Sequence, residues 1–232
     1  VYEGSYLVRW LGGLLGRRGV QTFGDLVDTA FAGDERHRFR LRVIAADVSR
    51  GRLLVLPQDI ARFGVRPEDL SVALAVRMSM SIPFFYEPVQ LRDMRTGRVS
   101  YIVDGGILSN FPVWLFDSQG PPRWPTFGFR LVGPGEVDGG YRQIRMPLDL
   151  ALAIVSTMMA AHDARHLQAA DHVRTISIPT LGIGTTRFGI SAAERRALYE
   201  AGRKAAADFF AGWDFGRYVR TFRAGIWPAV TP

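Results

Sequence analysis

Tyr101-Ile102-Val103-Asp104-Gly105-Gly106 is the most informative run of residues in this chain. Three apolar residues lead directly into a carboxylate, and two glycines follow it. The apolar run predicts a buried strand. The two glycines after the aspartate predict a tight turn, because glycine lacks a Cβ atom and lets the backbone pass close to its neighbours. Since α/β enzymes keep functional groups at the carboxyl ends of such strands, Asp104 is the leading candidate for a catalytic residue.

A second interpretation of Asp104 stays open. An aspartate before glycine often accepts a hydrogen bond from its own backbone and only shapes a turn. The other Asp-Gly-Gly sequence, at Asp138, lies in a run rich in glycine and proline and is interpreted as such a loop. Because only Asp104 follows an apolar strand, the catalytic hypothesis rests on Asp104.

The composition indicates one globular domain covering residues 1–232. The chain has 47% hydrophobic residues, enough for a large core, and no linker-like change of composition divides it. No apolar run reaches the roughly 18 residues that span a bilayer, so any membrane contact is expected to be peripheral. The absence of cysteine excludes disulfides and thiolate metal sites.

The net charge of +7 favours anionic partners. The arginines are scattered and no nucleic-acid recognition motif accompanies them, so we expect no nucleic-acid partner. Peripheral contact with an anionic membrane is the remaining specific hypothesis. A merely solvated basic surface is the alternative.

Hydrophobic periodicity predicts alternating helices and strands. Helices are expected at residues 6–17, from Pro67 to before Pro83, at 148–170 and at 191–210; strands are expected at 39–46, 53–56, 89–91, 99–103, 127–132 and 173–178. Several of the strands lack polar alternation, which is typical of a sheet covered on both faces. The predicted fold class is therefore α/β with a mostly parallel central sheet.

Two other clusters invite functional interpretations. His162-Asp163-Ala164-Arg165-His166 imitates a zinc-binding helix, but Asp replaces the usual Glu and no third ligand is evident, so no metal site is predicted. The C-terminal region mixes aromatic and basic residues that could lie at a lipid interface: Trp213, Phe215, Arg217, Tyr218, Arg220, Phe222, Arg223 and Trp227. Their helical spacing favours packing on the core instead.

Taken together, several segments resemble the patatin-like phospholipase family. The residues that carry the resemblance are Gly4-Ser5-Tyr6-Leu7, residues 19–26, Val76-Arg77-Met78-Ser79-Met80-Ser81-Ile82-Pro83 with Pro88-Val89, Asp104-Gly105-Gly106 with Asn110 and Pro112, and residues 178–188. The resemblance implies a three-layer α/β/α hydrolase that cleaves acyl esters of lipids with a serine–aspartate dyad. Such a dyad needs no metal and no organic cofactor.

The resemblance also implies roles for individual residues. Asp104 corresponds to the dyad aspartate, the general base that accepts the serine proton. Gly105 and Gly106 let the backbone turn beside the nucleophile, and Asn110 helps to hold that loop in shape.

The family's glycine-rich oxyanion segment and its G-x-S-x-G elbow are not in this sequence. We therefore expect the nucleophilic serine, and the N-terminal strands of the sheet, to lie upstream of Val1. On this view the intact protein is a serine acyl hydrolase, and the present chain alone is inactive. The alternative is a catalytically inactive lipid-binding or regulatory module. The sequence names neither the lipid nor the oligomeric state, and the expected location is cytoplasmic or peripheral at a membrane surface.

Overall fold

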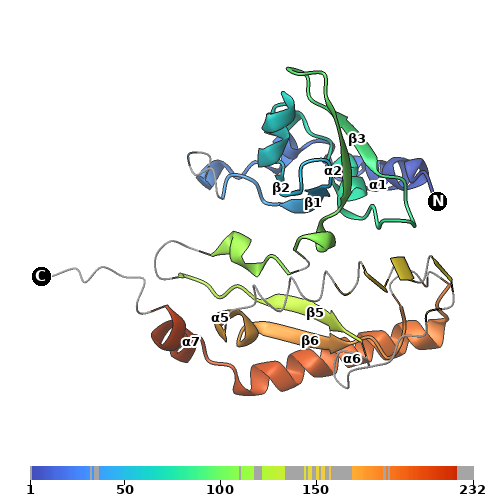
Figure 1. Cartoon of the computed structure of the whole chain (residues 1–232). Helices are drawn as coiled ribbons and strands as arrows, with labels where there is room; N and C mark the ends of the chain where they lie inside the picture. The colour runs from blue at the N-terminus through green and yellow to red at the C-terminus, as the bar shows by residue number, and fades with distance from the viewer. Residues whose placement is uncertain are drawn as a thin grey trace, which may run out of the picture. The chain divides into compact units, whose positions relative to one another are not determined.

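The protein was analysed as a computed structural model, which describes residues 2–31, 33, 37–109, 111–117, 122–133, 144, 146–147, 150–151, 153–154, 157, 169–184, 187 and 189–223. The chain divides into two compact units, shown in Figure 1. Unit 1 comprises residues 1–110 and 144–164, and unit 2 comprises residues 111–143 and 165–232.

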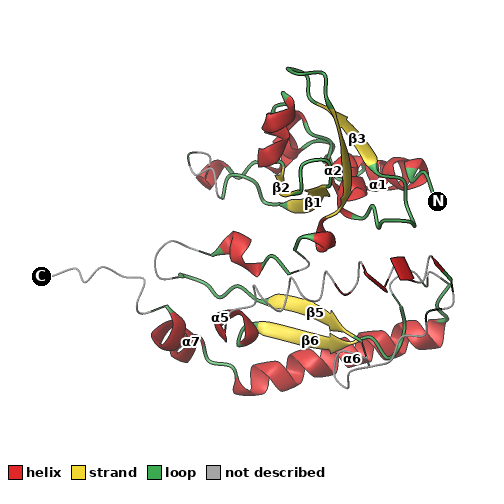
Figure 2. Cartoon of the chain, viewed as in Figure 1, coloured by secondary structure: helices red, strands yellow, loops and turns green. Residues whose placement is uncertain are grey.

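A four-stranded sheet forms the centre of unit 1. Its strands are β1 (Val43–Asp47), β2 (Arg52–Leu56), β3 (Val89–Arg92) and β4 (Val99–Asp104), in the order β2-β1-β4-β3. All neighbouring strands are antiparallel. Strands β1 and β4 are the inner pair, so the candidate aspartate ends a strand that is paired on both sides. Figure 2 shows the strands in yellow.

The structure confirms the α/β class but corrects the expectation of a mostly parallel sheet. Four residues join β1 to β2 and six join β3 to β4. Parallel strands need a crossover of about a dozen residues or more, so connections this short produce antiparallel hairpins. Burial follows the place of each strand in the sheet: four of the five residues of the inner strand β1 are buried, whereas the edge strand β3 has no buried residue.

Two helices of unit 1 accompany the sheet. Helix α1 spans Ser5–Gly16, close to the expected 6–17, and α2 spans Val72–Ser79 and contacts β1 and β4. The helix expected from Pro67 begins later, because Leu70 has extended backbone (ψ 126°) and separates a short 3-10 turn from α2. Ser71 caps α2, its side chain accepting a hydrogen bond from the amide of Leu74 at 3.3 Å.

The core of unit 1 lies between the sheet, α2 and the 3-10 turns. It contains side chains with almost no solvent exposure: Phe23, Leu54, Leu56, Ile60, Phe63, Met78 and Ile102. Because these residues come from 3-10 turns, β2, α2 and β4, the core fixes α2 and β4 relative to one another.

Unit 2 contains a two-stranded parallel sheet of β5 (Gly128–Val132) and β6 (Thr175–Pro179). Its helices are α5 (Ala169–His172), α6 (Ala192–Gly212) and α7 (Phe215–Phe222). Helix α6 packs against β6 and begins with the expected capping box of Ser191 and Glu194. Most of the helix expected at 148–170 lies outside the described residues.

A buried arginine organises unit 2. The Arg174 side chain is 2% exposed, and its guanidinium donates to both carboxylate oxygens of Asp117 and, at 2.6 Å, to Asp171. Arg223 adds a second cation, 2.7 Å from Asp117. Burial alone would raise the pKa of Asp117, but the hydrogen bonds and charges of Arg174 and Arg223 hold it below its ordinary value.

Replacing this cation is expected to destabilise unit 2. Arg174→Met leaves partly buried carboxylates without their main partner, and we expect a loss of about 3 kcal/mol in the free energy of unfolding at pH 7, measured by urea denaturation. The pKa of Asp117 is lowered in the fold, so its stabilisation is present above about pH 4 and is lost as the pH falls through the lowered value. The difference in the free energy of unfolding between wild type and variant should therefore become smaller at acidic pH.

Arg203→Met provides the control, because that exposed arginine forms its ion pair with Glu200 at the surface of α6. An equal loss in both variants would contradict the role assigned to Arg174.

Candidate active site

Asp104 lies at the carboxyl end of the inner strand β4, as expected. The two residues before it, Ile102 and Val103, are buried in the sheet, and Asp104 itself is partly buried. This burial raises the pKa of the Asp104 carboxyl above its ordinary value, with one backbone hydrogen bond acting against it. A carboxylate with a raised pKa is a stronger base than an ordinary one, which is the property that proton abstraction requires.

The turn after Asp104 is a short 3-10 helix, Gly105–Ile107. The Asp104 carboxylate accepts a hydrogen bond from the amide of Gly106 at 2.8 Å. This is the bond that the turn-shaping interpretation predicts. It leaves acceptor capacity on the carboxylate, so the same residue can shape the turn and still accept a proton.

Gly105 is required by close contact with the neighbouring strand. A Cβ atom at this position would lie 2.7 Å from the carbonyl oxygen of Ile44 and 2.8 Å from its carbonyl carbon. Both atoms belong to the backbone of β1, which cannot move without disturbing the sheet. The glycine therefore allows the chain to leave β4 directly beside β1, and this path sets the direction of the Asp104 turn.

The segment from Ser81 to Pro83 contacts the site through its backbone. The amide of Asp104 donates to the carbonyl oxygen of Ser81 at 3.0 Å. The Ser81 side chain is fully buried; its hydroxyl donates to the carbonyl oxygen of Arg77 at 2.7 Å and accepts from the Arg77 guanidinium. Ser81 is thus a structural residue that holds the Asp104 backbone.

Arg77 holds the segments around the site together, a role that the sequence analysis did not assign to it. It is 4% exposed, and its Nη2 atom donates to the carbonyl oxygens of Glu3 at 2.7 Å and Glu87 at 2.8 Å. Burial lowers the pKa of its guanidinium. An arginine four residues before Ser81 in an otherwise apolar helix was the available signal, because residues four apart share a helix face.

Gly4 makes room for this guanidinium. A Cβ atom at Gly4 would lie 2.0 Å from Nε of Arg77, and the residue has a φ of +76°. The Arg77 side chain thereby connects the start of α1, the end of α2 and the segment before β3.

Comparison with known proteins identifies the family of the chain. The sequence profile of the patatin-like phospholipase family matches residues 1–117. The chain is 37% identical over 215 residues to the uncharacterized protein YqhO of Bacillus subtilis, a match that covers 93% of this chain and 69% of YqhO. It is also 53% identical over 45 residues to the RpoH suppressor of Rhizobium meliloti, covering 19% of this chain and 7% of that protein.

The chain belongs to the patatin-like phospholipase family. Membership of this family points to hydrolysis of lipid esters. The matched region of the patatin-like domain contains both Asp104 and the Arg77–Ser81 pair. Asn110, the third residue expected to support the loop, lies outside the described residues, as do His162 and His166. Among the described residues, no group of three or more His, Cys, Asp or Glu side chains is arranged so that it could hold a metal ion.

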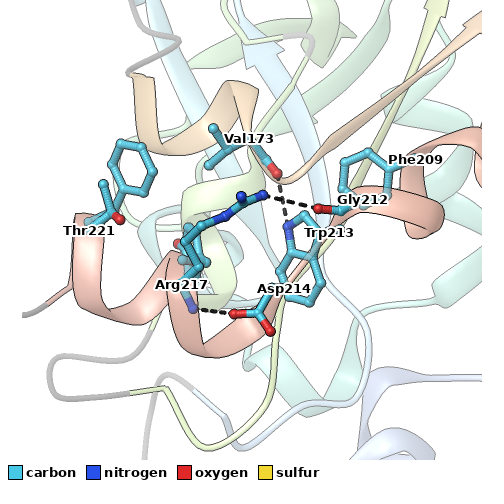
Figure 3. Close-up of a pocket in the computed structure, with 9 residues that line it drawn as sticks. Val173, Phe209, Gly212, Trp213, Asp214, Arg217 and Thr221 are labelled. Carbon is cyan, nitrogen blue, oxygen red and sulfur yellow. Dashed lines mark hydrogen bonds between the residues drawn. The ribbon is translucent and has the colours of Figure 1, made fainter.

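A pocket of about 430 Å³ lies in unit 2, outside the part that the patatin-like profile matches (Figure 3). Its polar groups are already engaged: the Trp213 indole donates to the carbonyl oxygen of Val173 at 2.9 Å, and Arg217 donates to that of Gly212 at 3.0 Å. Trp213 also packs against Phe127, with ring centroids 4.7 Å apart. The C-terminal aromatic residues up to Phe222 therefore pack on unit 2, as their spacing predicted, and Trp227 lies outside the described residues.

The steric need for Gly105 predicts a loss of stability on substitution. Gly105→Ala should lower the free energy of unfolding by about 1–3 kcal/mol, because the new methyl group overlaps the β1 backbone. Gly13→Ala, in the exposed part of α1 with no atom near its Cβ position, should instead raise it by about 0.5–1 kcal/mol. Thermal and urea unfolding of both variants measure the difference. If both substitutions changed the free energy of unfolding in the same direction, close contact of Gly105 with the β1 backbone would not explain the result.

Proposed function

We propose that the protein is a serine acyl hydrolase of lipid esters, of the phospholipase A type, in which Asp104 is the general base. One observation carries the proposal. Within the region that the patatin-like profile matches, the partly buried carboxylate of Asp104 ends an inner strand, and burial raises its pKa. Asp47, which ends the other inner strand, is instead paired with Arg50 and Arg52. Position and basicity together suit a group that takes a proton from an alcohol.

The proposed reaction follows the nucleophile-plus-base scheme without a histidine. A serine hydroxyl attacks the acyl carbonyl carbon while its proton passes to Asp104. The protonated Asp104 then returns the proton to the leaving alcohol, and an acyl-serine ester remains. Water then attacks the acyl-serine carbonyl carbon while its proton passes to Asp104, and Asp104 returns that proton to the serine oxygen as the fatty acid leaves. Backbone amides of a glycine-rich segment would hold the oxyanion.

The nucleophile is proposed to lie upstream of Val1. Ser81 is the serine nearest to Asp104 in the hydrogen-bond network described above, but its hydroxyl is fully buried and bound to Arg77, so it cannot approach a substrate. The YqhO protein extends beyond the region that matches this chain, which leaves room there for further strands and a serine elbow.

Further properties belong to the same proposal. The two sheets would be parts of one three-layer α/β/α domain covering residues 1–232, completed by upstream strands. The substrate would be a lipid ester at an anionic membrane surface that the protein contacts peripherally. Within the described residues, no helix has both the length and the apolar character needed to cross a bilayer.

Asp104→Asn tests the proposed base. Asparagine can keep the hydrogen bond from Gly106 but cannot accept the serine proton, so kcat on a soluble short-chain ester should fall by about 10²- to 10⁴-fold. The assay uses the intact protein. Asp138→Asn, in the other Asp-Gly-Gly sequence, is the matched control and should keep full activity. Full activity of Asp104→Asn would overturn the assignment.

The raised pKa of Asp104 adds a pH prediction. The ionised carboxylate is the base, so the acid limb of the kcat/KM profile should lie above the ordinary aspartate pKa of about 4. Because the pKa is raised in the fold, ionisation disfavours the folded state, and stability falls as the pH rises through the raised value. Asp104→Asn should therefore be at least as stable as wild type at pH 7, as measured by urea unfolding.

A fluorophosphonate probe distinguishes the enzyme from an inactive lipid-binding or regulatory module. The intact protein should react at one serine upstream of residue 1, identified by peptide mass spectrometry. An unreactive protein would support the module.

A further inference from the structure

Helix α1 presents an unusual exposed face. Of its residues, Tyr6, Arg9, Trp10, Gly13 and Gly16 are exposed, and Arg17 continues the same face beyond its end. The spacing of three and four residues places all six on one side of the helix. We call this set the α1 stripe. Tyr6 is 72% exposed and Trp10 52% exposed, although both have large apolar rings.

The chemistry of the α1 stripe suits the surface of an anionic bilayer. Tyrosine and tryptophan are favoured where apolar chains meet water, since one end of each ring is apolar and the other polar. The two arginines supply positive charge, and α1 contains no acidic residue to oppose it. A helix with aromatic residues and arginines on its exposed face can lie in the plane of an interface.

The α1 stripe begins next to the candidate active site. Glu3, just before α1, is held through its carbonyl oxygen by Arg77, which also binds Ser81. The carbonyl oxygen of Ser81 in turn accepts from the Asp104 amide. This chain of bonds fixes the start of α1 relative to the turn that carries the proposed base.

A further exposed aromatic residue lies in the adjoining loop. Phe84 is 51% exposed and has a φ of +67°, a strained conformation for a phenylalanine. Its loop is tied to the start of α1 by the bridge between Tyr2 and Tyr86. Exposed rings therefore occur both on α1 and on the loop joined to it.

We propose that the α1 stripe is the surface by which the protein docks on an anionic phospholipid bilayer. The inference deepens the proposed function, because it names the surface that brings the Asp104 site to its lipid substrate. It also places the lipid contact on α1 and not on the described C-terminal aromatic residues, up to Phe222, which pack within unit 2.

A matched pair of double variants tests the proposal. Tyr6→Ser with Arg9→Gln removes one tyrosine and one positive charge from the stripe. Tyr199→Ser with Arg196→Gln removes the same groups, at the same spacing of three, from the exposed surface of α6, where Tyr199 is 69% exposed. The intact protein is sedimented with vesicles of phosphatidylcholine containing phosphatidylglycerol, and with vesicles of phosphatidylcholine alone.

Wild type should bind the anionic vesicles more strongly, with an affinity that falls as salt is added. The stripe variant should lose about fivefold in partitioning for the lost charge alone, and more for the lost ring. The α6 variant should lose much less. Equal losses in the two variants, or equal binding to both kinds of vesicle, would overturn the proposal.

A site-specific label gives an independent measurement. The chain contains no cysteine, so Gly13→Cys introduces a single thiol at the middle of the stripe, where no atom lies near the Cβ position. A polarity-sensitive fluorophore there should shift to the blue when anionic vesicles are added, and the same label at Ala207→Cys on α6 should not. A label at residue 13 that is already shielded without vesicles would show that protein covers the stripe and would overturn the proposal.

Two further measurements separate the possible failures. Asp104→Asn should bind vesicles like wild type, and the stripe variant should keep its activity on a soluble short-chain ester. If Asp104 were not the base, vesicle binding would still occur.

A nucleic-acid ligand is a separate outcome. If wild type did not bind vesicles but bound a fluorescent single-stranded RNA, and the stripe variant lost that binding, the surface would be assigned to nucleic acid and the docking proposal rejected.

Discussion

The guanidinium of Arg77 holds together the segments that surround Asp104. It is buried, it donates hydrogen bonds to two backbone carbonyl oxygens and to the Ser81 hydroxyl, and it lies 5.2 Å from the centre of the Tyr86 ring. Among the described residues no carboxylate forms an ion pair with it. A buried charge is tolerated only when its donors are satisfied, so the surrounding backbone must keep the one arrangement that supplies those acceptors. The start of α1, the end of α2 and the loop before β3 are therefore fixed together.

The Asp104 site combines a tight backbone path with an unfavourable charge. Gly105 lets the chain pass against the β1 backbone, and Ser81 holds the Asp104 amide. This rigid path keeps the carboxylate in a partly buried place, where ionisation costs more than in water. A base that is held in such a place works against the stability of the fold, and the core and the Arg77 contacts must offset that cost. Such opposition between stability and chemistry is expected at an active site.

The aromatic residues around Trp213 and those on α1 differ in their surroundings. In unit 2, Trp213 stacks among phenylalanine and tyrosine rings, and its indole N–H is satisfied by a backbone carbonyl. On α1 the rings of Tyr6 and Trp10 extend into solvent beside arginines. Composition alone does not separate these cases, because both regions mix aromatic and basic residues. Burial separates them, since only rings that lack protein contacts are available to a lipid surface.

Local sequence determined much of the architecture. The apolar run before Asp104 marked β4, the spacing of leucines marked α1, and Ser191 with Glu194 marked the start of α6, because each of these signals acts between residues close in the chain. The short connections from β1 to β2 and from β3 to β4 were also a sequence signal for antiparallel pairing, although the apolar strands were interpreted as parallel. Only the tertiary structure decided why Gly105 must be glycine and what Arg77 does. Both depend on atoms distant in sequence, the Ile44 carbonyl and the Glu3 carbonyl, which no local pattern brings together.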